Sequence, residues 1–248
     1  MTKLGIIGGT GLTQLADLTL IKRESLTTPY GQPSADFITG ELAGKTVVFL
    51  ARHGNPHTIP PHKINYRANI WGLKQLGVDN IIAVAAVGGI SPAMAPAHIA
   101  IPDQLIDYSY GRKHTFFETE DYPVTHIDFS FPYNPKLRAA LCAAAAQAGV
   151  AVTQTGTYGC TQGPRLETIA EITRMEQDGC DLVGMTGMPE AALAKEIGMA
   201  YASVSVIANW AAGKSAGEIT MAEIEQNLHI GMANAAKLLK AYIAMADD

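Results

Sequence analysis

Short apolar runs alternate along the chain with longer segments in which apolar positions recur at helical spacing. The short runs are rich in Val and Ile and are mostly apolar on both faces, as in strands buried within a sheet. They predict strands at residues 4–7, 46–51, 81–87, 152–158, 182–185 and 201–208. The longer segments predict helices at residues 63–76, 134–148, 165–177, 189–196 and 221–246.

Glycines mark the ends of several predicted helices. Gly77, Gly149, Gly179 and Gly198 stand where a helix commonly ends in a residue with left-handed backbone. The alternation of strands with helices indicates an α/β fold with a central mixed, largely parallel β-sheet flanked by helices. No linker, repeat or low-complexity tract interrupts the pattern, so the sequence predicts a single domain over residues 1–248.

The chain is short of charge. Charged residues make up 17% of it, against roughly a quarter in an ordinary soluble domain. Either the core is large or another subunit covers much of the surface. Residues 108–133, an irregular stretch rich in aromatic residues, Pro and His, are a candidate interface, because loops of that length are usually functional or interfacial.

The distribution of charge excludes two classes of partner. The net charge is -5, and the Lys and Arg residues are scattered rather than clustered, so we expect no nucleic-acid partner. No run approaches the ~18 apolar residues that span a bilayer, and the apolar run near the N-terminus is too short for a signal peptide. We therefore expect no membrane partner and a cytoplasmic protein.

Cysteine and histidine spacing gives no sign of a metal. Cys142, Cys160 and Cys180 are an odd number without a CxxC pair. They predict buried, unpaired thiols in a reducing compartment rather than a disulfide scaffold or a structural zinc site. The sequence also lacks a GxSxG motif or a Ser–His–Asp order that would indicate a protein nucleophile. We expect neither a metal nor an organic cofactor.

The first predicted strand runs into a glycine-rich turn, Gly8-Gly9-Thr10-Gly11. Converging N–H groups and the Thr10 hydroxyl could hold an anion there, and a tight turn without a ligand is the alternative. A dinucleotide fingerprint is disfavoured because Gln14 stands at its third glycine position. A phosphate-binding P-loop is excluded because no Gly-Lys-Ser/Thr follows.

Other polar residues follow other predicted strands. Arg52 and His53 come directly after residues 46–51, and Thr186 follows residues 182–185. Open α/β sheets bind ligands at the carboxyl ends of their strands. Arg presents a fork to phosphate oxygens, and His can add a donor. These strand ends together predict an oxyanion pocket at the edge of the sheet. The alternative for Arg52 and His53 is a surface Arg beside a His whose hydrogen bonds are made within the protein.

Four long motifs resemble a known family. They are GIIGGTGL at residues 5–12, LARHGNPHTIPPHKINYRANIWGLKQLG at 50–77, GPRLETIAE at 163–171 and GMTGMPEAALAKEIGMAYASVSVIANW at 184–210. Over nearly the whole chain the sequence resembles the trimeric purine nucleoside phosphorylases and methylthioadenosine phosphorylases. The resemblance implies an enzyme that cleaves a purine nucleoside with inorganic phosphate. It also implies a homotrimer with sites near subunit interfaces.

The resemblance assigns roles to individual positions. It implies phosphate binding by Thr10, Arg52, His53, the backbone at Ala86, and Thr186. It implies contacts with the sugar by Met185 under the ribose, by His57, and by His126 from the neighbouring subunit at the 5′ end. Leu166 replaces an aromatic residue that stacks on the base, and Ala85 replaces a polar residue, so we expect poorer stacking and a missing or replaced phosphate donor.

The base-recognition positions favour a 6-oxopurine. Asn209-Trp210-Ala211 stands where the methylthioadenosine branch has Asp-x-Asp, and Glu167 where it has a small hydroxyl residue. A Glu167 carboxylate can accept from N1–H of a 6-oxopurine, and the Asn209 amide can donate to N7 or O6 as the base departs. We therefore take Glu167, Asn209 and His53 as the catalytic candidates. The alternative is that Glu167 is a solvent-exposed helix residue and that Asn209 only forms a turn.

The resemblance places the 5′ end of the nucleoside at the start of the last predicted helix, where the inosine and guanosine branch has a His and the methylthioadenosine branch has apolar residues. Met221 and Ile224 are spaced i, i+3 at the start of the last predicted helix and so share one face. Met can pack on a thioether, whereas a buried 5′-hydroxyl would lack a partner there. Taken alone, a Met and an Ile on one helix face usually belong to the hydrophobic core. Together with the oxopurine positions, the pair predicts phosphorolysis of 5′-methylthioinosine to hypoxanthine and 5-methylthioribose 1-phosphate. The alternatives are inosine or guanosine phosphorolysis, methylthioadenosine phosphorolysis, and a non-catalytic nucleoside-binding relative.

Overall fold

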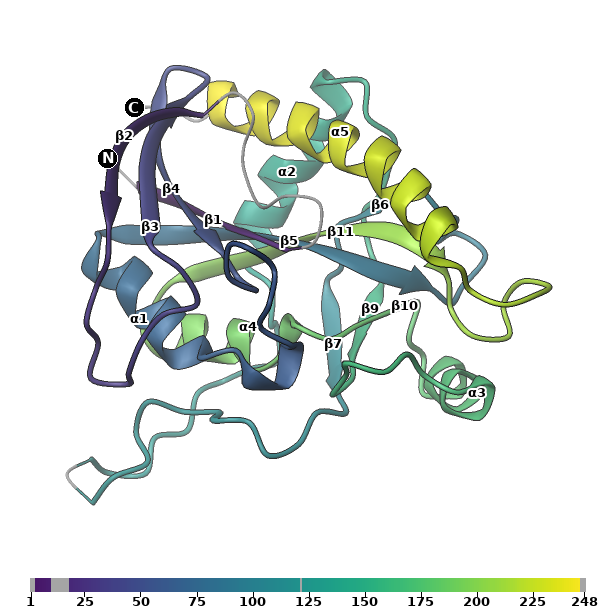
Figure 1. Ribbon diagram of the computed structural model, residues 1–248, viewed down its shortest axis with the longest axis horizontal. Coiled ribbons are helices and arrows are strands. Elements are labelled where there is room, and N and C mark those ends of the chain that lie inside the picture. The colour runs from purple at the N-terminus through teal and green to yellow at the C-terminus, as the bar shows by residue number, and fades with distance from the viewer. Residues whose placement is uncertain (1–2, 10–17, 121, 246–248) are drawn as a thin grey trace.

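A computed structural model describes residues 3–9, 18–120 and 122–245 of the chain. Its described strands form one mixed sheet (Figure 1) with the order β2-β3-β4-β1-β5-β10-β9-β7, and β11, β6 and β8 extend from β5 as a branch. The strands are β1 (Lys3–Gly8), β2 (Thr19–Glu24), β3 (Phe37–Leu42), β4 (Lys45–Ala51), β5 (Val78–Gly89), β6 (Ile99–Ala100), β7 (Gln104–Asp107), β8 (Val152–Thr153), β9 (Thr157–Cys160), β10 (Leu182–Gly184) and β11 (Ala200–Trp210).

Helices cover both faces of the sheet. They are α1 (Tyr66–Gln75), α2 (Pro135–Gln147), α3 (Ile169–Gln177), α4 (Gly187–Glu196) and α5 (Met221–Met245), with a short 3₁₀ turn η1 (Pro61–Lys63). In Figure 1, α2 and α5 lie on one face and α1 and α4 on the other, while α3 lies apart beside β10. The expected α/β fold with a mixed, largely parallel sheet is confirmed.

Two apolar cores result from the alternation of side chains along the central strands. Ile81 and Ala83 of β5 belong to the core that packs on α1 and α4. Ile82 and Val84 of the same strand belong to the core that packs on α2 and α5. This is why β5 reads as a continuous apolar run rather than as an alternating one.

The length of β5 creates the opening for a site. β1 pairs with β5 only as far as Ile7 opposite Ala83, and β10 begins to pair with β5 at Gly88. β11 follows β5 throughout on its other side. Among the described strands, residues 84–87 therefore have a partner on one side only. The carboxyl ends of β1 and β4 stop beside this gap, which is where parallel sheets bind ligands.

The boundaries of several elements differ from the prediction. The predicted strand 152–158 is two strands, β8 and β9, because the chain turns at Gly156 and the halves pair with different neighbours. The predicted helix 63–76 begins at Tyr66, because the Asn65 side chain caps it. The predicted helix 165–177 begins at Ile169, because Thr168 and Glu171 form a capping box there. Strands β2, β3, β6 and β7 were not predicted.

Other sequence expectations fare better. The four glycines predicted to end helices have φ between 65° and 89°, in the left-handed region. All three cysteines are free thiols, as predicted, but Cys142 is half-buried rather than buried. Within the described ranges, no helix has the length and apolar character needed to cross a membrane. The prediction of one domain over residues 1–248 stays a prediction.

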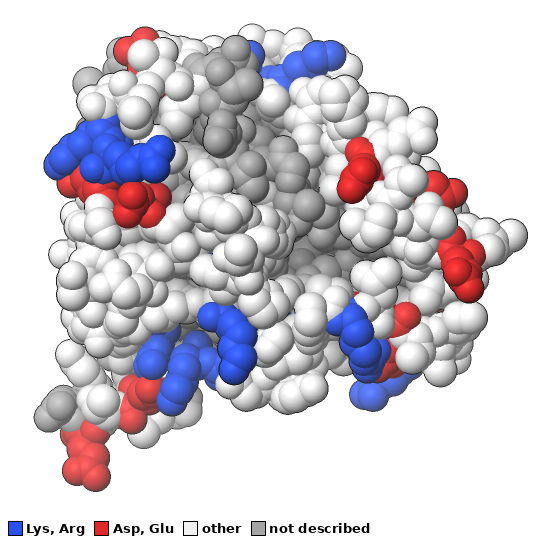
Figure 2. All heavy atoms as spheres, viewed as in Figure 1, with Lys and Arg blue, Asp and Glu red and all other residues white. Residues whose placement is uncertain are grey.

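Charged side chains are unevenly distributed over one face of the molecule. On the face drawn in Figure 2, the Lys, Arg, Asp and Glu side chains lie mainly around the periphery, in clusters of mixed sign. Residues 108–120 and 122–133 leave the sheet after β7 and extend as the teal loop at the lower left of Figure 1. Several large apolar side chains of this stretch are exposed, including Tyr110, Tyr122, Val124 and Phe131.

Candidate active site

A cavity of about 610 Å³ opens at the gap beside β5. Its walls come from the loop after β4, the end of β5, the loop before α3, the end of β10, and the chain from β11 to α5. Most of the predicted site residues line it. These are Arg52, His53, His57, Ala86, Leu166, Glu167, Met185, Thr186, Asn209, Ala211, Met221 and Ile224.

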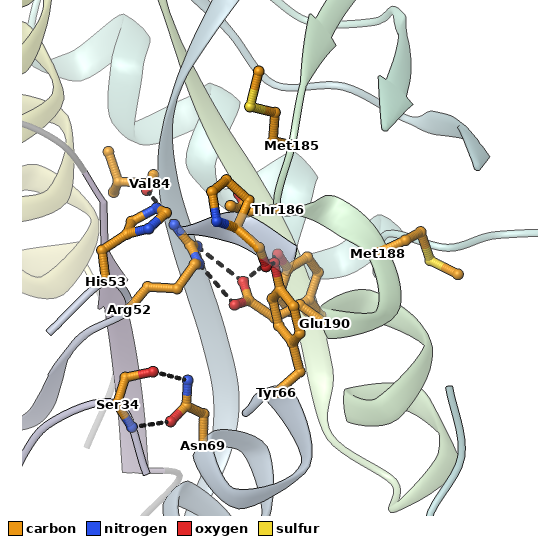
Figure 3. A network of polar contacts seen from close by, with 12 residues as sticks. Ser34, Arg52, His53, Tyr66, Asn69, Val84, Met185, Thr186, Met188 and Glu190 are labelled. Atoms are coloured by element: carbon orange, nitrogen blue, oxygen red, sulfur yellow. Dashed lines mark hydrogen bonds and ion pairs between the residues drawn. The ribbon is translucent and has the colours of Figure 1, made fainter. Parts of the chain in front are cut away.

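Arg52 lines the cavity, but part of its guanidinium is already bound within the protein. Its Nε and Nη2 atoms donate to the two carboxylate oxygens of Glu190 at 2.7 and 2.9 Å, and Nη1 donates to the Val84 carbonyl at 3.2 Å. Figure 3 shows this pair bridging from β4 to α4. Of the five N–H groups of a guanidinium, two remain for a ligand, one on each Nη atom.

The Arg52–Glu190 pair is buried on both sides. The two side chains are 1% and 0% exposed, and Tyr201 also donates to Glu190, at 2.8 Å. Burial alone would lower the pKa of Arg52, but the charge and hydrogen bonds of Glu190 outweigh it and raise that pKa. Arg52 is thus a permanent cation whose charge is balanced by a carboxylate. Gly9 permits this packing, since a Cβ there would lie 3.1 Å from Nη1 of Arg52.

His53 is neutral in this site. Its Nδ1 lies 2.8 Å from the carbonyl oxygen of Ile59, so Nδ1 must carry the proton and Nε2 is an acceptor. Burial, then the charges of Arg52 and His57, lower the pKa of His53 to about 4. The ring stacks on His57 with centroids 4.3 Å apart. In this tautomer His53 presents the lone pair of Nε2 to the cavity, and its predicted role as a hydrogen-bond donor stays a prediction.

Thr186 and Met185 lie where β10 passes into α4. Thr186 is 6% exposed and is the N-cap residue of α4, but its side chain makes no capping hydrogen bond. Its side chain interacts with the Tyr158 hydroxyl and lines the cavity, where it can also meet a ligand. The backbone at Met188 is not helical, so the first regular turn of α4 begins after it. Met185 packs against Gly163, whose Cβ, if present, would lie 2.5 Å from the Met185 sulfur.

Glu167 and Asn209 form a polar part of the cavity wall. Glu167 lies in the loop before α3, half-buried, and its Oε1 accepts from the Thr161 hydroxyl at 2.6 Å. Asn209 is within β11, where a bulge at Ala208 breaks the register with β5, and such bulges re-aim side chains. The Asn209 amide donates to the Trp210 carbonyl at 2.7 Å. One amide hydrogen and the amide oxygen of Asn209 remain for a ligand.

Apolar side chains line the cavity where α5 begins. Met221 and Ile224 are joined there by Ile219 and by Leu228, one turn further along α5 than Ile224. Met221 is 66% exposed and lies at the rim, whereas Leu228 is 6% exposed. The stripe predicted from the i, i+3 spacing thus faces the cavity and is longer than the sequence indicated.

Some predicted residues are not brought to the cavity. The Trp210 side chain does not line it, because successive side chains of β11 point to opposite faces and Asn209 takes the inward position. His126 is exposed and does not line the cavity of its own chain, so its role from a neighbouring subunit stays a prediction. Thr10 lies outside the described residues. Ala85 lines the cavity and offers no polar side chain.

Glu190, Thr161 and Arg112 are functional candidates that the sequence reasoning missed. Glu190 has a signal in the sequence, because it is a charged residue in the otherwise apolar start of a predicted helix. Thr161 and Arg112 have none, because their contacts depend on loops that lie far apart in the chain. Among the described residues, no group of three or more His, Cys, Asp or Glu is placed to hold a metal ion.

Comparison with known proteins places the chain in a family. Residues 3–244 match the model of the phosphorylase superfamily, and the chain belongs to that superfamily. It is 59% identical to a probable S-methyl-5′-thioinosine phosphorylase of Pseudomonas syringae pv. tomato, with 94% of each chain covered. It is 43% identical to the 6-oxopurine nucleoside phosphorylase of Pyrococcus furiosus, covering 99% of this chain and 93% of the relative.

Solved structures agree with this assignment. A methylthioadenosine phosphorylase from Schistosoma mansoni in complex with adenine superposes with a TM-score of 0.95. Its sequence is 29% identical, and the match covers 100% of this chain and 93% of the other. The family and the fold are therefore established independently of the site residues.

Proposed function

We propose that this enzyme cleaves S-methyl-5′-thioinosine with inorganic phosphate, giving hypoxanthine and 5-methylthioribose 1-phosphate. The observation that carries the proposal is that one cavity combines Glu167 and Asn209 with an apolar wall of Ile219, Met221 and Ile224. The first pair matches the edge of an oxopurine, and the second set matches a methylthio group. The Pseudomonas syringae relative bears the name of this activity.

The base is selected by hydrogen-bond polarity. A 6-oxopurine has a proton on N1, which Glu167 accepts, whereas a 6-aminopurine has a lone pair there that would face the carboxylate. Leaving a buried polar group unpaired costs about 1–3 kcal/mol, and more when it is charged. The Thr161 hydroxyl donates a hydrogen bond to Oε1 of Glu167 at 2.6 Å and so restrains the orientation of the carboxylate. Adenine nucleosides should therefore be poor substrates.

The reaction needs no protein nucleophile, because phosphate attacks C1′ and the C1′–N9 bond breaks. Two N–H groups of Arg52 and the Thr186 hydroxyl hold the phosphate oxygens. The lone pair on Nε2 of His53 accepts a hydrogen bond from a protonated phosphate oxygen or a sugar hydroxyl. The phosphate charge stabilises the oxocarbenium character of C1′, and Asn209 and Glu167 bind the departing base.

A second candidate substrate class is supported by one observation. Met221 is 66% exposed, so a 5′-hydroxyl at this rim could reach water in the single chain. That would favour inosine or guanosine, and the Pyrococcus furiosus relative is named for 6-oxopurine nucleosides. Methylthioadenosine is disfavoured by Glu167, despite the structural neighbour named for it.

A panel of four nucleosides tests the proposal. Methylthioinosine, inosine, guanosine and methylthioadenosine are each incubated with phosphate, and base release is measured as kcat/KM. We expect methylthioinosine to exceed inosine and to exceed methylthioadenosine by orders of magnitude, since sites built on such pairing discriminate by up to roughly 10⁴–10⁵. A preference for inosine would replace the proposal by the second candidate. Release of base without phosphate would reject a phosphorylase altogether.

We propose further that the active form is a homotrimer in the cytoplasm. The open rim at Met221 and the exposed apolar residues Tyr110, Tyr122, Val124 and Phe131 support coverage by a neighbouring subunit. Three free thiols support a reducing compartment. His126 of a neighbouring subunit would then close the 5′ end of the site.

A further inference from the structure

Arg112 belongs to the irregular stretch 108–133, but unlike much of that stretch its side chain is buried. It is 9% exposed, and all three of its guanidinium nitrogens donate hydrogen bonds. Nε donates to the Gln162 side chain at 3.1 Å, and Nη2 to the carbonyls of Thr161 and Gln162 at 3.0 and 2.9 Å. Nη1 donates to the carbonyls of Met185 and Met188 at 2.8 and 2.5 Å, and because it has two hydrogens, its 3.3 Å contact with the Tyr66 hydroxyl shares one of them.

These acceptors lie in segments that support separate walls of the cavity, although Met185 alone among the five acceptor residues lines it. Thr161 holds Glu167 through its hydroxyl, so the first wall is the base side. Met185 lines the cavity and precedes Thr186 at the start of α4, so the second wall is the sugar and phosphate side. The Tyr66 hydroxyl donates to the carbonyl of Pro61 at 3.0 Å, and Pro61 lines the third wall. Arg112 itself does not line the cavity.

The first two walls also contact each other directly. Gly163 has φ of 62°, and a side chain there would collide with the Met185 sulfur. The segments that Arg112 joins directly follow β9 and β10, where the Thr161 N–H donates to the Gly184 carbonyl at 2.8 Å, so Arg112 adds to a backbone link between these two walls. A planar group with five donors can hold several carbonyls at once, which a Lys ammonium cannot do.

We propose that Arg112 is a positioning residue that clamps the base wall, the sugar and phosphate wall and the Pro61 wall in one arrangement. It does not touch the substrate. Its role is to fix Glu167 relative to Met185 and Thr186, so that the base edge and C1′ are held at the distance that the reaction requires. This role rests on the proposed function, because it assigns the base to the Glu167 side.

Arg138 provides a matched control. It also donates to backbone carbonyls, those of Ile101, Pro102 and Gln154, and none of these residues lines the cavity. Arg112→Gln and Arg138→Gln thus each remove a guanidinium that holds loop carbonyls, one beside the cavity and one away from it. Arg112→Lys and Tyr66→Phe are milder variants, and they carry the test if Arg112→Gln fails to fold.

The first measurement is kinetic. We expect Arg112→Gln to lower kcat/KM for methylthioinosine about 100-fold, as small misplacements do, and to lower the preference for methylthioinosine over methylthioadenosine about 10-fold. Arg112→Lys should lie between this variant and the wild type. Arg138→Gln should lower the melting temperature while leaving kcat/KM and the preference within about threefold. Equal kinetic losses in both glutamine variants, or an unchanged preference in Arg112→Gln, would overturn the proposal.

The second measurement is hydrogen exchange, which does not depend on activity. We expect faster exchange in residues 161–167 and 185–188 together in Arg112→Gln and Arg112→Lys, and not in Arg138→Gln. Tyr66→Phe should speed exchange near Pro61. Unchanged exchange in both segments would overturn the clamp. If the wild type cleaves none of the four nucleosides, the proposed function fails, and the exchange result still decides whether Arg112 holds the walls together.

Discussion

Arg52 and His53 carry less positive charge into the site than their residue types imply. Arg52 is the only Lys or Arg in the described lining of the cavity, and its charge is balanced by Glu190. His53 is neutral because its pKa is lowered to about 4. The chain has a net charge of -5, so we infer that phosphate is held by directed N–H and O–H donors rather than by a positive field.

The neutrality of His53 predicts a pH dependence of stability. The pKa of His53 in the folded chain is about 4, below its value of about 6.5 in the unfolded chain. Between these pH values the unfolded chain binds a proton at His53 and the folded chain does not. The stabilisation is complete above about pH 6.5 and is lost as the pH falls toward 4, by up to about 2 kcal/mol between pH 6.5 and 5.

Urea unfolding at pH 7 and pH 5 measures this effect in the wild type and in His53→Asn. The variant should lose less stability between the two pH values. His98, whose pKa is also lowered by burial, acts in the same direction in both proteins, and so the difference isolates His53. The same pH dependence in both proteins would contradict a neutral, buried His53.

Met221 tests the 5′ end of the site at the level of one side chain. Met221→His places a hydrogen-bonding ring at the rim beside Ile219 and Ile224. We expect kcat/KM to rise for inosine and to fall for methylthioinosine, moving their ratio by about 10–100-fold. Val at the same position is the control, because it keeps the wall apolar and should leave the ratio nearly unchanged. An unmoved ratio in Met221→His would mean that the 5′ group lies elsewhere.

Elements position these residues through their relative lengths. β5 continues past the end of β1, so its last residues line the cavity instead of pairing within the sheet. The bulge at Ala208 turns Asn209 into the same space. α4 begins directly after β10, and this connection brings Glu190 under Arg52 at the end of β4.

The link between β4 and α4 predicts a large stability effect. In Glu190→Gln, an amide NH₂ would face at least one of the donors that now meet the carboxylate, from Arg52 or Tyr201. Breaking a buried ion pair typically costs about 3–5 kcal/mol. Tyr201→Phe, which removes one hydrogen bond to the same carboxylate, should cost only about 1.5–3 kcal/mol. Urea unfolding at matched protein concentration measures both, and a loss below 1 kcal/mol in Glu190→Gln would contradict the pairing.

The contact between the loop before α3 and the end of β10 predicts a separable effect on activity. Gly163 and Gly149 have φ of 62° and 65°, but only Gly163 has a side chain, that of Met185, in the space of a Cβ. Ala at either position should cost about 1 kcal/mol of backbone strain. Gly163→Ala should in addition displace Met185 and lower kcat/KM about 10–100-fold. Equal activity of the two variants would show that Met185 does not need this position.

At the scale of the whole molecule, the low charge content has two sources. The sheet carries helices on both faces and therefore two apolar cores. Residues 108–133 also expose large apolar side chains, of which Val124 is 82% exposed. Exposed large apolar side chains are candidates for an interaction surface.

The proposed trimer can be measured directly. Light scattering should give a mass about three times the 26.3 kDa of one chain, and specific activity should fall on dilution below the dissociation range. His126→Ala should lower kcat/KM for methylthioinosine without changing the mass. A monomer with full activity would remove His126 and the neighbouring subunit from the site.

The sequence by itself determined the fold class and most of the cavity lining. Apolar runs and helix-ending glycines fix the central strands and helices, because burial on both faces and left-handed backbone are local requirements. The edge strand β2 escaped prediction because five of its six residues are exposed, so they carry no burial pattern. Residues at strand ends, such as Arg52, Thr186 and Asn209, could be placed together because carboxyl ends of neighbouring strands share one edge.

Tertiary structure alone decided what those residues can do. The sequence indicated phosphate binding at Arg52 and His53, but it gave no sign that Glu190 and the Ile59 carbonyl bind part of these two side chains. It gave no sign that Arg112 joins three walls of the cavity. The physical reason is that hydrogen-bond partners and desolvation are set by residues distant along the chain, and these meet only when the loops close over the sheet.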